Sequence, residues 1–348
     1  MNKVVTFGEI MLRLSPLSQA RFAQAFPGNV GATFAGAEAN AAVTIASLGG
    51  DASFVTTLPE GPLADACVAD LKGHGVETRF VVRTSSDRLG IFFYEPGSGL
   101  RPGEVIYDRC GSAVSLAESS QYNWDDIFDG AAWFLVSGIT PAISETAAIA
   151  TRHAMQAARK HGVRVAMDIN YRSKLWQWRE GTSAEALAAE TLSELARLCD
   201  LLVCGTDDAT RFLGCSSVES IEAAARELST RYDNLKLIAS SVRNESEDAR
   251  LRYGGFLLDC ETRQATFSPH DGGYRINEIV DRLGVGDAFI GALLLELSRS
   301  ATNQRAIDIA AAAGTLAHSV QGDYGLITPK EVDALISQGE SGHGRVRR

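Results

Sequence analysis

An acidic residue lies inside a glycine-rich turn in the segment IVDRLGVGDAFIGAL, which spans residues 279–293. Gly284 and Gly286 let other groups approach the backbone closely, and the first N–H groups of the helix predicted from Gly286 onward lack intrahelical acceptors. Such N–H groups, at the positive end of a helix dipole, stabilise the charge of a transferring phosphoryl group. Asp287 could then accept the proton of an attacking hydroxyl as a general base. The competing interpretation is an ordinary strand-to-helix turn that Asp287 caps.

A glycine and an asparagine stand together at the start of another predicted helix, in the segment GAEANAA at residues 36–42. Gly36 allows a sugar hydroxyl close to the backbone, and Asn40, one turn later, offers both a hydrogen-bond donor and an acceptor. A helix that packs through its alanine face would explain the alanines. It would not explain the pairing of glycine with asparagine, so this segment is a candidate sugar site.

The two segments resemble the two signatures of the PfkB, or ribokinase-like, family of carbohydrate kinases. The second signature, DTxGAGDxFxxG, is matched by Asp281, Gly284, Gly286, Asp287 and Phe289. Arg282 and Val285 depart from it, but neither change removes a backbone N–H. The first signature, GGxxxNxAxxxxxLG, resembles residues 36–49. The resemblance implies in-line phosphoryl transfer from ATP, with Asp287 as the base and the amides of residues 284–286 holding the phosphoryl group.

Two arginines suggest that the acceptor is a sugar acid. Residues 107–113, YDRCGSA, resemble the YxRxGSA element of 2-keto-3-deoxygluconate kinases, in which Tyr107 and Arg109 would reach the substrate carboxylate. Residues 168–176, DINYRSKLW, match the DxNxRxxLW motif of the same kinases and contribute Arg172. Two arginines from separate elements suit a carboxylate better than a neutral hexose. A surface ion pair is the alternative for each arginine.

Further substrate ligands are implied by the same resemblance. Asp168 and Asn170 belong to the DxNxR motif, at the strand edge where open α/β sheets bind ligands. Glu9 follows the first predicted strand and could bind sugar hydroxyls, or simply cap that strand. Asp323, in the segment GDYG, matches a late family position near the substrate, although a Gly-Asp turn is also a common loop. The expected substrate is 2-keto-3-deoxygluconate, with its C6 hydroxyl facing Asp287.

ATP and Mg²⁺ are the implied cofactors, and here the sequence departs most from the family. Residues 205–208, GTDD, replace the usual NxxE, so Asp208 is expected to hold Mg²⁺ through water. Residues 239–246, ASSVRNES, replace the usual KxGxxG and resemble a TxRxS variant. Arg243 is therefore expected to bind the β- or γ-phosphate, together with Gly284 and Gly286. A solvent-facing arginine is the alternative, and the need for a monovalent cation stays open.

The predicted elements place these residues on an α/β scaffold. Short apolar runs that predict buried strands occur at residues 4–7, 52–57, 132–136, 164–167, 201–203 and 235–239. Helical spacing occurs at residues 38–48, 62–74, 144–161, 184–198, 220–232 and 286–298. This alternation predicts a mostly parallel central sheet with helices on both faces.

Two segments break the alternation and are predicted to form a small β lid, at about residues 13–34 and 87–109. The second segment has the pattern of a β-hairpin, with apolar runs at residues 90–94 and 104–107 around a turn rich in glycine and proline. We expect one ribokinase-like kinase domain over residues 1–338 and a disordered tail at 339–348. The resemblance further implies a homo-oligomer that assembles through the lid.

Composition excludes several other classes of function. The 348 residues carry a net charge of −10 with scattered basic residues, which argues against nucleic acid as a partner. No run of about 18 apolar residues could span a membrane, and the N-terminus does not resemble a signal peptide. Six cysteines without a CxxC pair fit reduced thiols, so a cytoplasmic enzyme is expected, with a sugar acid and ATP as its small-molecule partners.

Two other functions compete with this prediction. A kinase of the same fold could act on 2-keto-3-deoxygalactonate, fructose or a nucleoside, although Arg109 and Arg172 favour an acid. A non-catalytic sugar-acid sensor would explain the altered asparagine and lysine positions on the ATP side. The intact GxGD that contains Asp287 argues against a sensor.

Overall fold

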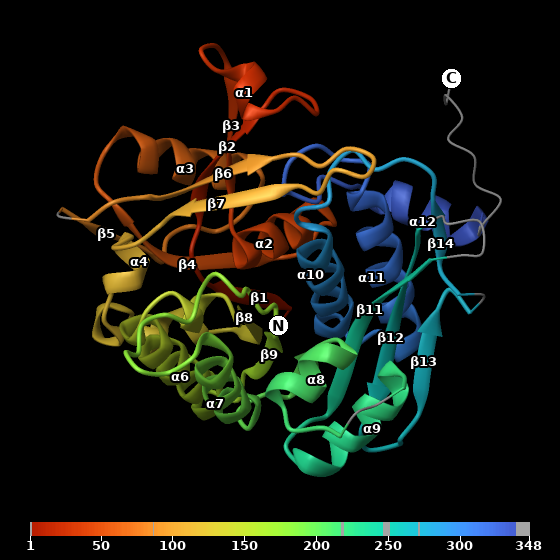
Figure 1. Cartoon of the computed structure of the whole chain (residues 1–348). Helices are drawn as coiled ribbons and strands as arrows, with labels where there is room; N and C mark the ends of the chain where they lie inside the picture. The colour runs from red at the N-terminus through yellow and green to blue at the C-terminus, as the bar shows by residue number, and fades with distance from the viewer. Residues whose placement is uncertain (1, 86, 217–218, 246–250, 271, 339–348) are drawn as a thin grey trace.

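A ten-stranded, mainly parallel sheet runs through the centre of the protein (Figure 1). The computed structural model describes residues 2–85, 87–216, 219–245, 251–270 and 272–338, so the tail predicted at 339–348 lies outside the described residues. The strands of the sheet are β1 Lys3–Phe7, β4 Ala52–Pro59, β5 Val81–Thr84, β8 Ala131–Ser137, β9 Arg164–Asp168, β10 Leu201–Val203, β11 Leu237–Glu245, β12 Leu251–Asp259, β13 Ala265–Ser268 and β14 Tyr274–Ile276.

The order of these strands is β13-β12-β11-β10-β9-β8-β1-β4-β5, with β14 paired to β12. Neighbours from β11 to β5 are parallel, whereas β12 pairs antiparallel with β11, β13 and β14. All six predicted strands belong to this sheet. The last of them differs from its prediction, because β11 begins at Leu237 and continues to Glu245. Arg243 therefore lies on this strand.

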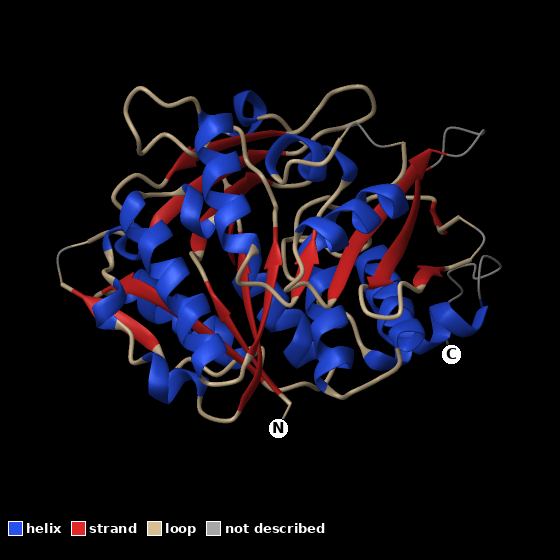
Figure 2. Cartoon of the chain, turned by 90° about the horizontal axis from the view of Figure 1, so that it is seen from below, coloured by secondary structure: helices blue, strands red, loops and turns tan. Residues whose placement is uncertain are grey.

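Helices cover both faces of the sheet (Figure 2), which confirms the predicted α/β class. Their bounds are α2 Ala37–Ser47, α3 Pro62–Gly73, α4 Ala113–Leu116, α5 Trp124–Phe128, α6 Glu145–Lys160, α7 Ala184–Ala196, α8 Thr206–Phe212, α9 Ile221–Arg231, α10 Val285–Ser298, α11 Asn303–Ala317 and α12 Pro329–Gln338. Alternate side chains of a strand face opposite layers: Val4 belongs to the apolar core that also contains α2, α10 and α11, and Val5 belongs to the core that contains α6 and α7. None of the helices in the described residues is long and apolar enough to cross a membrane.

A separate four-stranded sheet, which we call the lid, lies over one edge of the central sheet (Figure 1). It is built from β2 Met11–Pro16, the short helix α1 Phe22–Ala25, β3 Val30–Ala35, β6 Gly90–Glu95 and β7 Glu104–Asp108. Its strand order is β3-β2-β6-β7, and the antiparallel pairing of β6 with β7 confirms the predicted hairpin. The inner side chains of the lid pack against Leu283, so the lid rests directly on the glycine-rich turn.

Candidate active site

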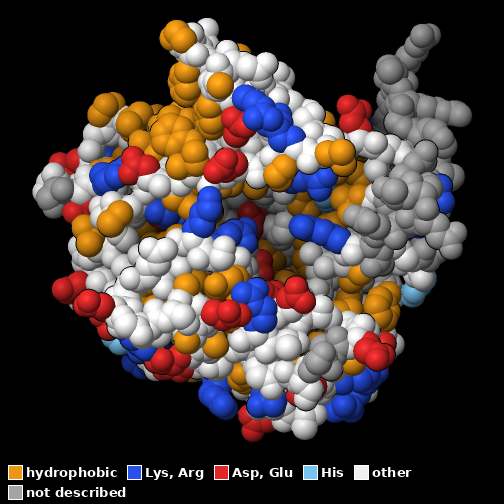
Figure 3. All heavy atoms as spheres, in the orientation of Figure 1, with side chains coloured by type: hydrophobic (Ala, Val, Ile, Leu, Met, Phe, Trp, Pro, Cys, Tyr) orange, Lys and Arg blue, Asp and Glu red, His pale blue; other side chains and the backbone are white. Residues whose placement is uncertain are grey.

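Two cavities meet at the glycine-rich turn. The larger, of about 670 Å³, lies between α8, β11 and the start of α10, and the smaller, of about 120 Å³, lies under the lid. Four residues line both cavities, namely Arg172, Leu283, Gly284 and Asp287. Figure 3 shows the hollow in this face of the molecule, with acidic and basic side chains gathered around it. The arrangement gives two ligand spaces that share one boundary.

The turn presents free N–H groups to the larger cavity. Gly284 caps α10 in the left-handed conformation, with φ of 76°, and a Cβ there would overlap the carbonyl oxygen of Asp323. The first intrahelical bond runs from the Ala288 N–H to the Gly284 carbonyl at 2.8 Å. The amides of residues 285–287 precede that bond, so they lack intrahelical acceptors. A Cβ at Gly286 would meet no atom within 4 Å, which leaves open space beside these donors.

Asp287 lies in the first turn of α10 and is joined to the first signature by a hydrogen bond. Asn40 Nδ2 donates to Asp287 Oδ2 at 2.7 Å, and Asn40 Oδ1 accepts from the Gly36 N–H at 3.1 Å. Burial raises the pKa of Asp287 to about 6, against the lowering effects of the Asn40 hydrogen bond and the Arg172 charge. Asp287 is therefore largely ionised at neutral pH and is still a competent proton acceptor.

The smaller cavity contains most of the residues predicted to bind the sugar. It is lined by Glu9, Gly36, Asn40, Tyr107, Arg109, Arg172 and Asp323. Arg109 is paired with Glu9: its Nε donates to Glu9 Oε2 at 2.7 Å, and its guanidinium lies 5.2 Å from the centre of the Tyr107 ring. Glu9 Oε1 is buried and has no hydrogen-bond partner among the described residues. Glu9 Oε1 can thus accept a hydrogen bond from a substrate hydroxyl, while Glu9 Oε2 is already paired with the Arg109 guanidinium.

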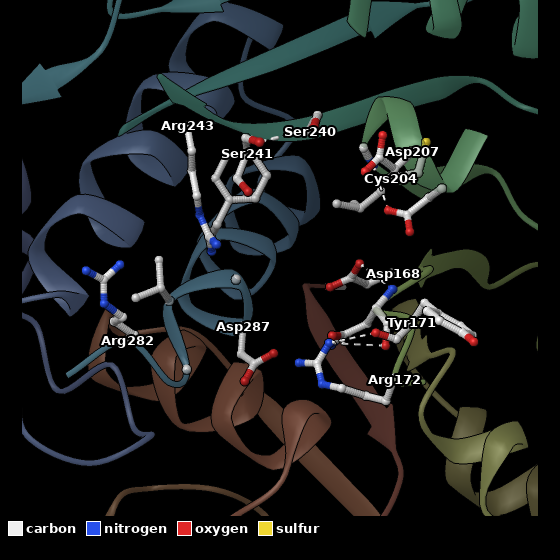
Figure 4. A pocket seen from close by; sticks show the side chains of 18 of the residues that line it. Asp168, Tyr171, Arg172, Cys204, Asp207, Ser240, Ser241, Arg243, Arg282 and Asp287 are labelled. Carbon is white, nitrogen blue, oxygen red and sulfur yellow. Dashed lines mark hydrogen bonds between the residues drawn. The ribbon is translucent and has the colours of Figure 1, made fainter. Parts of the chain in front are cut away.

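Arg172 lines both cavities. Its side chain lies beside Asp287 (Figure 4). Its Nη1 donates to the carbonyls of Asn170 and Tyr171 at 3.4 and 3.1 Å. Both acceptors are neutral, so the guanidinium charge is still available to an anionic ligand. Asn170 has a left-handed backbone, with φ of 39°, that turns the chain at the end of β9.

Asp168 and Asn170 line the larger cavity and not the smaller one, which differs from their predicted contact with the sugar. The raised pKa of Asp168, about 8, results from burial and from the nearby carboxylates of Asp287 and Asp208. Burial also raises the pKa of Asp208, whose Oδ2 accepts from the Gly205 N–H at 2.9 Å. Mg²⁺ prefers carboxylate oxygens and keeps several of its waters. The described residues contain no group of three His, Cys, Asp or Glu side chains that could hold a metal ion alone, so Asp168 and Asp208 fit Mg²⁺ only if water and phosphate oxygens complete its coordination.

Two further arginines line the larger cavity opposite the acids. Arg243 lies on β11, with its guanidinium 5.9 Å from the centre of the Tyr253 ring, and Arg282 lies within the turn itself (Figure 4). Together with Arg172 and the amides of α10 they offer positive charge from three elements. The volume, the donors and the charge of this cavity fit a nucleoside triphosphate.

The sequence did not reveal two buried charged residues near the site. Arg13, on lid strand β2, donates to Asp281 Oδ2 at 2.7 Å and to Asp323 Oδ1. Asp323 thus lines the predicted sugar cavity, but its Oδ1 already accepts a hydrogen bond from Arg13. Glu38 Oε1 accepts from the N–H and hydroxyl of Ser137 at 2.8 and 2.7 Å, and burial raises its pKa. For Arg13, the available signal in the sequence was its position as a charged residue among the apolar residues of a short strand.

The fold and the site together define a phosphotransferase with an alcohol acceptor. A model of the pfkB family of carbohydrate kinases matches residues 1–243, and the chain belongs to this family. It is 35% identical to a 2-dehydro-3-deoxygalactonokinase of Haloferax volcanii over 345 residues, 99% of each chain. It is 26% identical to a 2-dehydro-3-deoxygluconokinase of Bacillus subtilis over 346 residues, 97% of each.

Solved structures share the ribokinase-like fold. A 2-dehydro-3-deoxygluconokinase of Thermotoga maritima superposes with a TM-score of 0.87 at 36% identity, over 97% of this chain and 100% of that one. More distant structures with the same fold hold nucleotide. A fructokinase of Xylella fastidiosa with bound ATP has a TM-score of 0.76 at 22% identity, and an Escherichia coli structure of the ribokinase II type was solved with ATP and Mg²⁺.

Proposed function

We propose that the protein transfers the γ-phosphoryl group of ATP to the C6 hydroxyl of 2-keto-3-deoxygluconate, also named 2-dehydro-3-deoxygluconate. The observation that carries this proposal is the shared boundary of the two cavities, formed by Arg172, Leu283, Gly284 and Asp287. A hydroxyl in the smaller cavity and a phosphoryl group in the larger one would meet at Asp287. In-line transfer requires that the two reacting groups face each other in this way.

A sugar acid is favoured over a neutral sugar by the arginines at the smaller cavity. Arg172 hydrogen-bonds only to neutral carbonyls in the described contacts, so its charge can pair with a carboxylate. Arg109 and Tyr107 line the same cavity and can add a hydrogen bond from the other side. The names of the two relatives with about 35% identity, a galactonokinase and a gluconokinase of 2-dehydro-3-deoxy acids, agree with this class of substrate.

In the proposed mechanism Asp287 Oδ1 or Oδ2 accepts the proton of the C6 hydroxyl as its oxygen meets phosphorus. Asn40 holds this carboxylate through a 2.7 Å hydrogen bond and fixes its orientation toward the acceptor. The amides of residues 285–287 and the Arg172 guanidinium stabilise charge on the transferring group. The lid covers the smaller cavity, which excludes water as a competing acceptor.

Mg²⁺, when bound with ATP, would neutralise phosphate charge, and Asp208 and Asp168 would hold it directly or through water. We further propose that Arg243 binds the β- or γ-phosphate, from the strand that faces the acids across the larger cavity. Arg282 can add charge at the turn. These roles on the nucleotide side follow from the charge and lining of the cavity.

The alternative functions differ in the acceptor or in turnover. A kinase specific for 2-keto-3-deoxygalactonate would use the same arginines, since the two acids are epimers with the same carboxylate. Fructose has no carboxylate that could pair with the Arg172 guanidinium. A sugar-acid sensor would bind the same ligand without transfer, but the ordered contact between Asn40 and Asp287 favours catalysis.

We also propose that the protein is a homo-oligomer that assembles through the lid. Large apolar side chains are exposed on lid segments: Leu17 is 59% exposed, Phe26 50% and Ile106 49%. Their burial against a second copy would remove apolar surface from water. The molar mass measured by light scattering would be a multiple of 37.2 kDa, and a single-chain mass at micromolar concentration would contradict the proposal.

The test of function is ADP release with ATP and Mg²⁺ over four acceptors: 2-keto-3-deoxygluconate, 2-keto-3-deoxygalactonate, fructose and ribose. We expect turnover of the keto-deoxy acids and its loss in Asp287→Asn, which keeps the shape of the side chain but removes the base. Preference for a neutral sugar would refute the role given to the arginines. Binding of an acid without any ADP release would support the sensor.

A further inference from the structure

A buried ion-pair cluster connects the lid to the phosphoryl-binding turn. Arg13, Asp281 and Asp323 are 4%, 6% and 8% exposed, so all three charges are withdrawn from water. Arg13 uses one terminal nitrogen for each acid: Nη2 donates to Asp281 at 2.7 Å, and Nη1 donates to Asp323. One guanidinium therefore holds together two carboxylates that would otherwise repel each other.

Each of the two acids contacts the turn on a different side. Asp281 Oδ1 accepts from the N–H groups of Arg282 at 2.8 Å and Leu283 at 3.2 Å, which fixes the chain just before Gly284. The backbone carbonyl of Asp323 lies against the Cα of Gly284, where no Cβ fits. The conformation of the turn thus depends on where both acids are held.

The cation of this cluster comes from the lid. Arg13 lies on β2, and its guanidinium lies 4.7 Å from the centre of the Tyr94 ring on β6. Met11 and Phe92 of the same strands pack with Leu283, which follows Asp281 in the turn. Neither acid forms an ion pair with any other cation in the described part of the chain. The lid therefore supplies the charge that both acids need.

We propose that Arg13 is a positioning residue for phosphoryl transfer: it holds Asp281 and Asp323 so that the turn presents the amides of residues 285–287 to the phosphoryl group only with the lid strand in place. Without the guanidinium, two buried carboxylates would be unpaired, and their repulsion and desolvation would displace the backbone of the turn. Displacement of about 1 Å at such donors can lower a rate about a hundredfold. Arg13 itself contacts no reacting atom, so its effect passes through the turn.

The inference rests on the proposed kinase function, and its test uses whichever acceptor the wild-type enzyme phosphorylates. Arg13→Gln removes the charge, and Arg13→Lys keeps the charge but cannot donate to both acids from a planar fork. Arg101→Gln is the matched control, because Arg101 forms another lid ion pair, with Glu95 at 3.2 Å, that does not contact the turn. For each variant the kcat, the KM of both substrates, the nucleotide Kd and the Tm would be measured.

We expect kcat to fall about tenfold to a hundredfold in Arg13→Gln and by an intermediate factor in Arg13→Lys, at a temperature where both are folded. Arg101→Gln should keep kcat within about twofold. In Arg13→Ala, guanidine at non-denaturing concentration should restore part of kcat, and tetramethylammonium, which is too large and cannot donate, should not.

Distinct outcomes separate the possible failures. A lower Tm with wild-type kcat in Arg13→Gln would mean that Arg13 serves stability alone, and the proposal would be wrong. If Arg13→Gln does not fold, Arg13→Lys decides, and wild-type kcat in that folded variant overturns the proposal. Loss of kcat in Arg101→Gln as well would indicate general damage to the lid, which also contradicts the specific role of Arg13. Inactivity of the wild-type enzyme on all acceptors would instead refute the proposed function.

Discussion

Replacement of Gly286 by alanine separates the stability of the turn from its function. Gly286 is the second residue of α10, has no left-handed backbone, and would place a Cβ within 4 Å of no other atom. The folded protein therefore has room for the methyl group. Alanine is favoured over glycine in a helix by about 1 kcal/mol, so the variant should be as stable as the wild type or slightly more stable.

The same methyl group would occupy space in the larger cavity beside the amides of residues 285–287. A phosphoryl group held by those amides would be pushed away from at least one donor. Loss of one such donor lowers kcat by about 10²- to 10³-fold, or roughly 2.7–4 kcal/mol of transition-state stabilisation. We therefore expect Gly286→Ala to combine an unchanged or raised Tm with a kcat lowered at least a hundredfold.

The assay is coupled ADP release at saturating ATP and acceptor, with Tm measured by differential scanning fluorimetry on the same samples. Gly73→Ala is the matched control, because Gly73 is a helical glycine whose Cβ would also meet nothing within 4 Å, at the end of α3 away from both cavities. Wild-type kcat in Gly286→Ala would refute the position that we assign to the phosphoryl group. A large drop in Tm would instead refute the packing argument.

Two further predictions concern pH and the arginines. Because the pKa of Asp287 is about 6 and only its carboxylate can accept the proton, kcat/KM should be constant above pH 6 and fall about tenfold per pH unit below it. A profile from pH 5 to 9 without this inflection would contradict the role of Asp287 as the general base. Arg172→Gln should raise the KM of the acid by about ten- to a hundredfold with little change in Tm, since Arg172 is exposed and bonds only to carbonyls. Arg109→Gln should also lower the Tm, because it leaves the buried Glu9 without its partner and lowers the free energy of unfolding by about 3–5 kcal/mol. Equal effects of Arg172→Gln and Arg109→Gln on the Tm would contradict this contrast.

Local patterns were sufficient to predict the turn and six of the ten strands of the central sheet, but β5, β12, β13 and β14 were not predicted. Apolar runs and helical spacing predicted the strands and helices because a parallel sheet covered on both faces needs continuous apolar strands. The turn at residues 284–287 was predictable because its function depends on backbone N–H groups, glycine and one acid, all of which are visible in a short segment. The hairpin of β6 and β7 was predictable from its turn residues.

Pairings between distant residues could not be predicted from these patterns. Nothing in the neighbourhood of Arg13 indicates that its partners follow about 270 and 310 residues later. The Glu9–Arg109 pair also joins residues far apart in the sequence and could not be predicted either. This pair means that Arg109 is already neutralised by a carboxylate and is not a free cation. Asp168 belongs to a substrate motif, yet it lines the nucleotide side, because the sheet edge serves both cavities. Two lid aromatics are also placed only by the structure: Phe92 lines the smaller cavity, and the Tyr94 ring lies 4.7 Å from the Arg13 guanidinium.

The division of the two cavities also bears on how such a protein can diversify. Of the residues that line only the smaller cavity, all but Asp323 lie between Glu9 and Ile139, whereas the larger cavity is lined by residues between Asp168 and Phe289, and the shared boundary is formed by Arg172 and the turn. Acceptor choice and phosphoryl chemistry are therefore encoded in consecutive stretches of the gene. Recombination near residue 150 could exchange the recognised sugar while the transfer machinery is inherited intact, provided that residue 13 still matches residues 281 and 323.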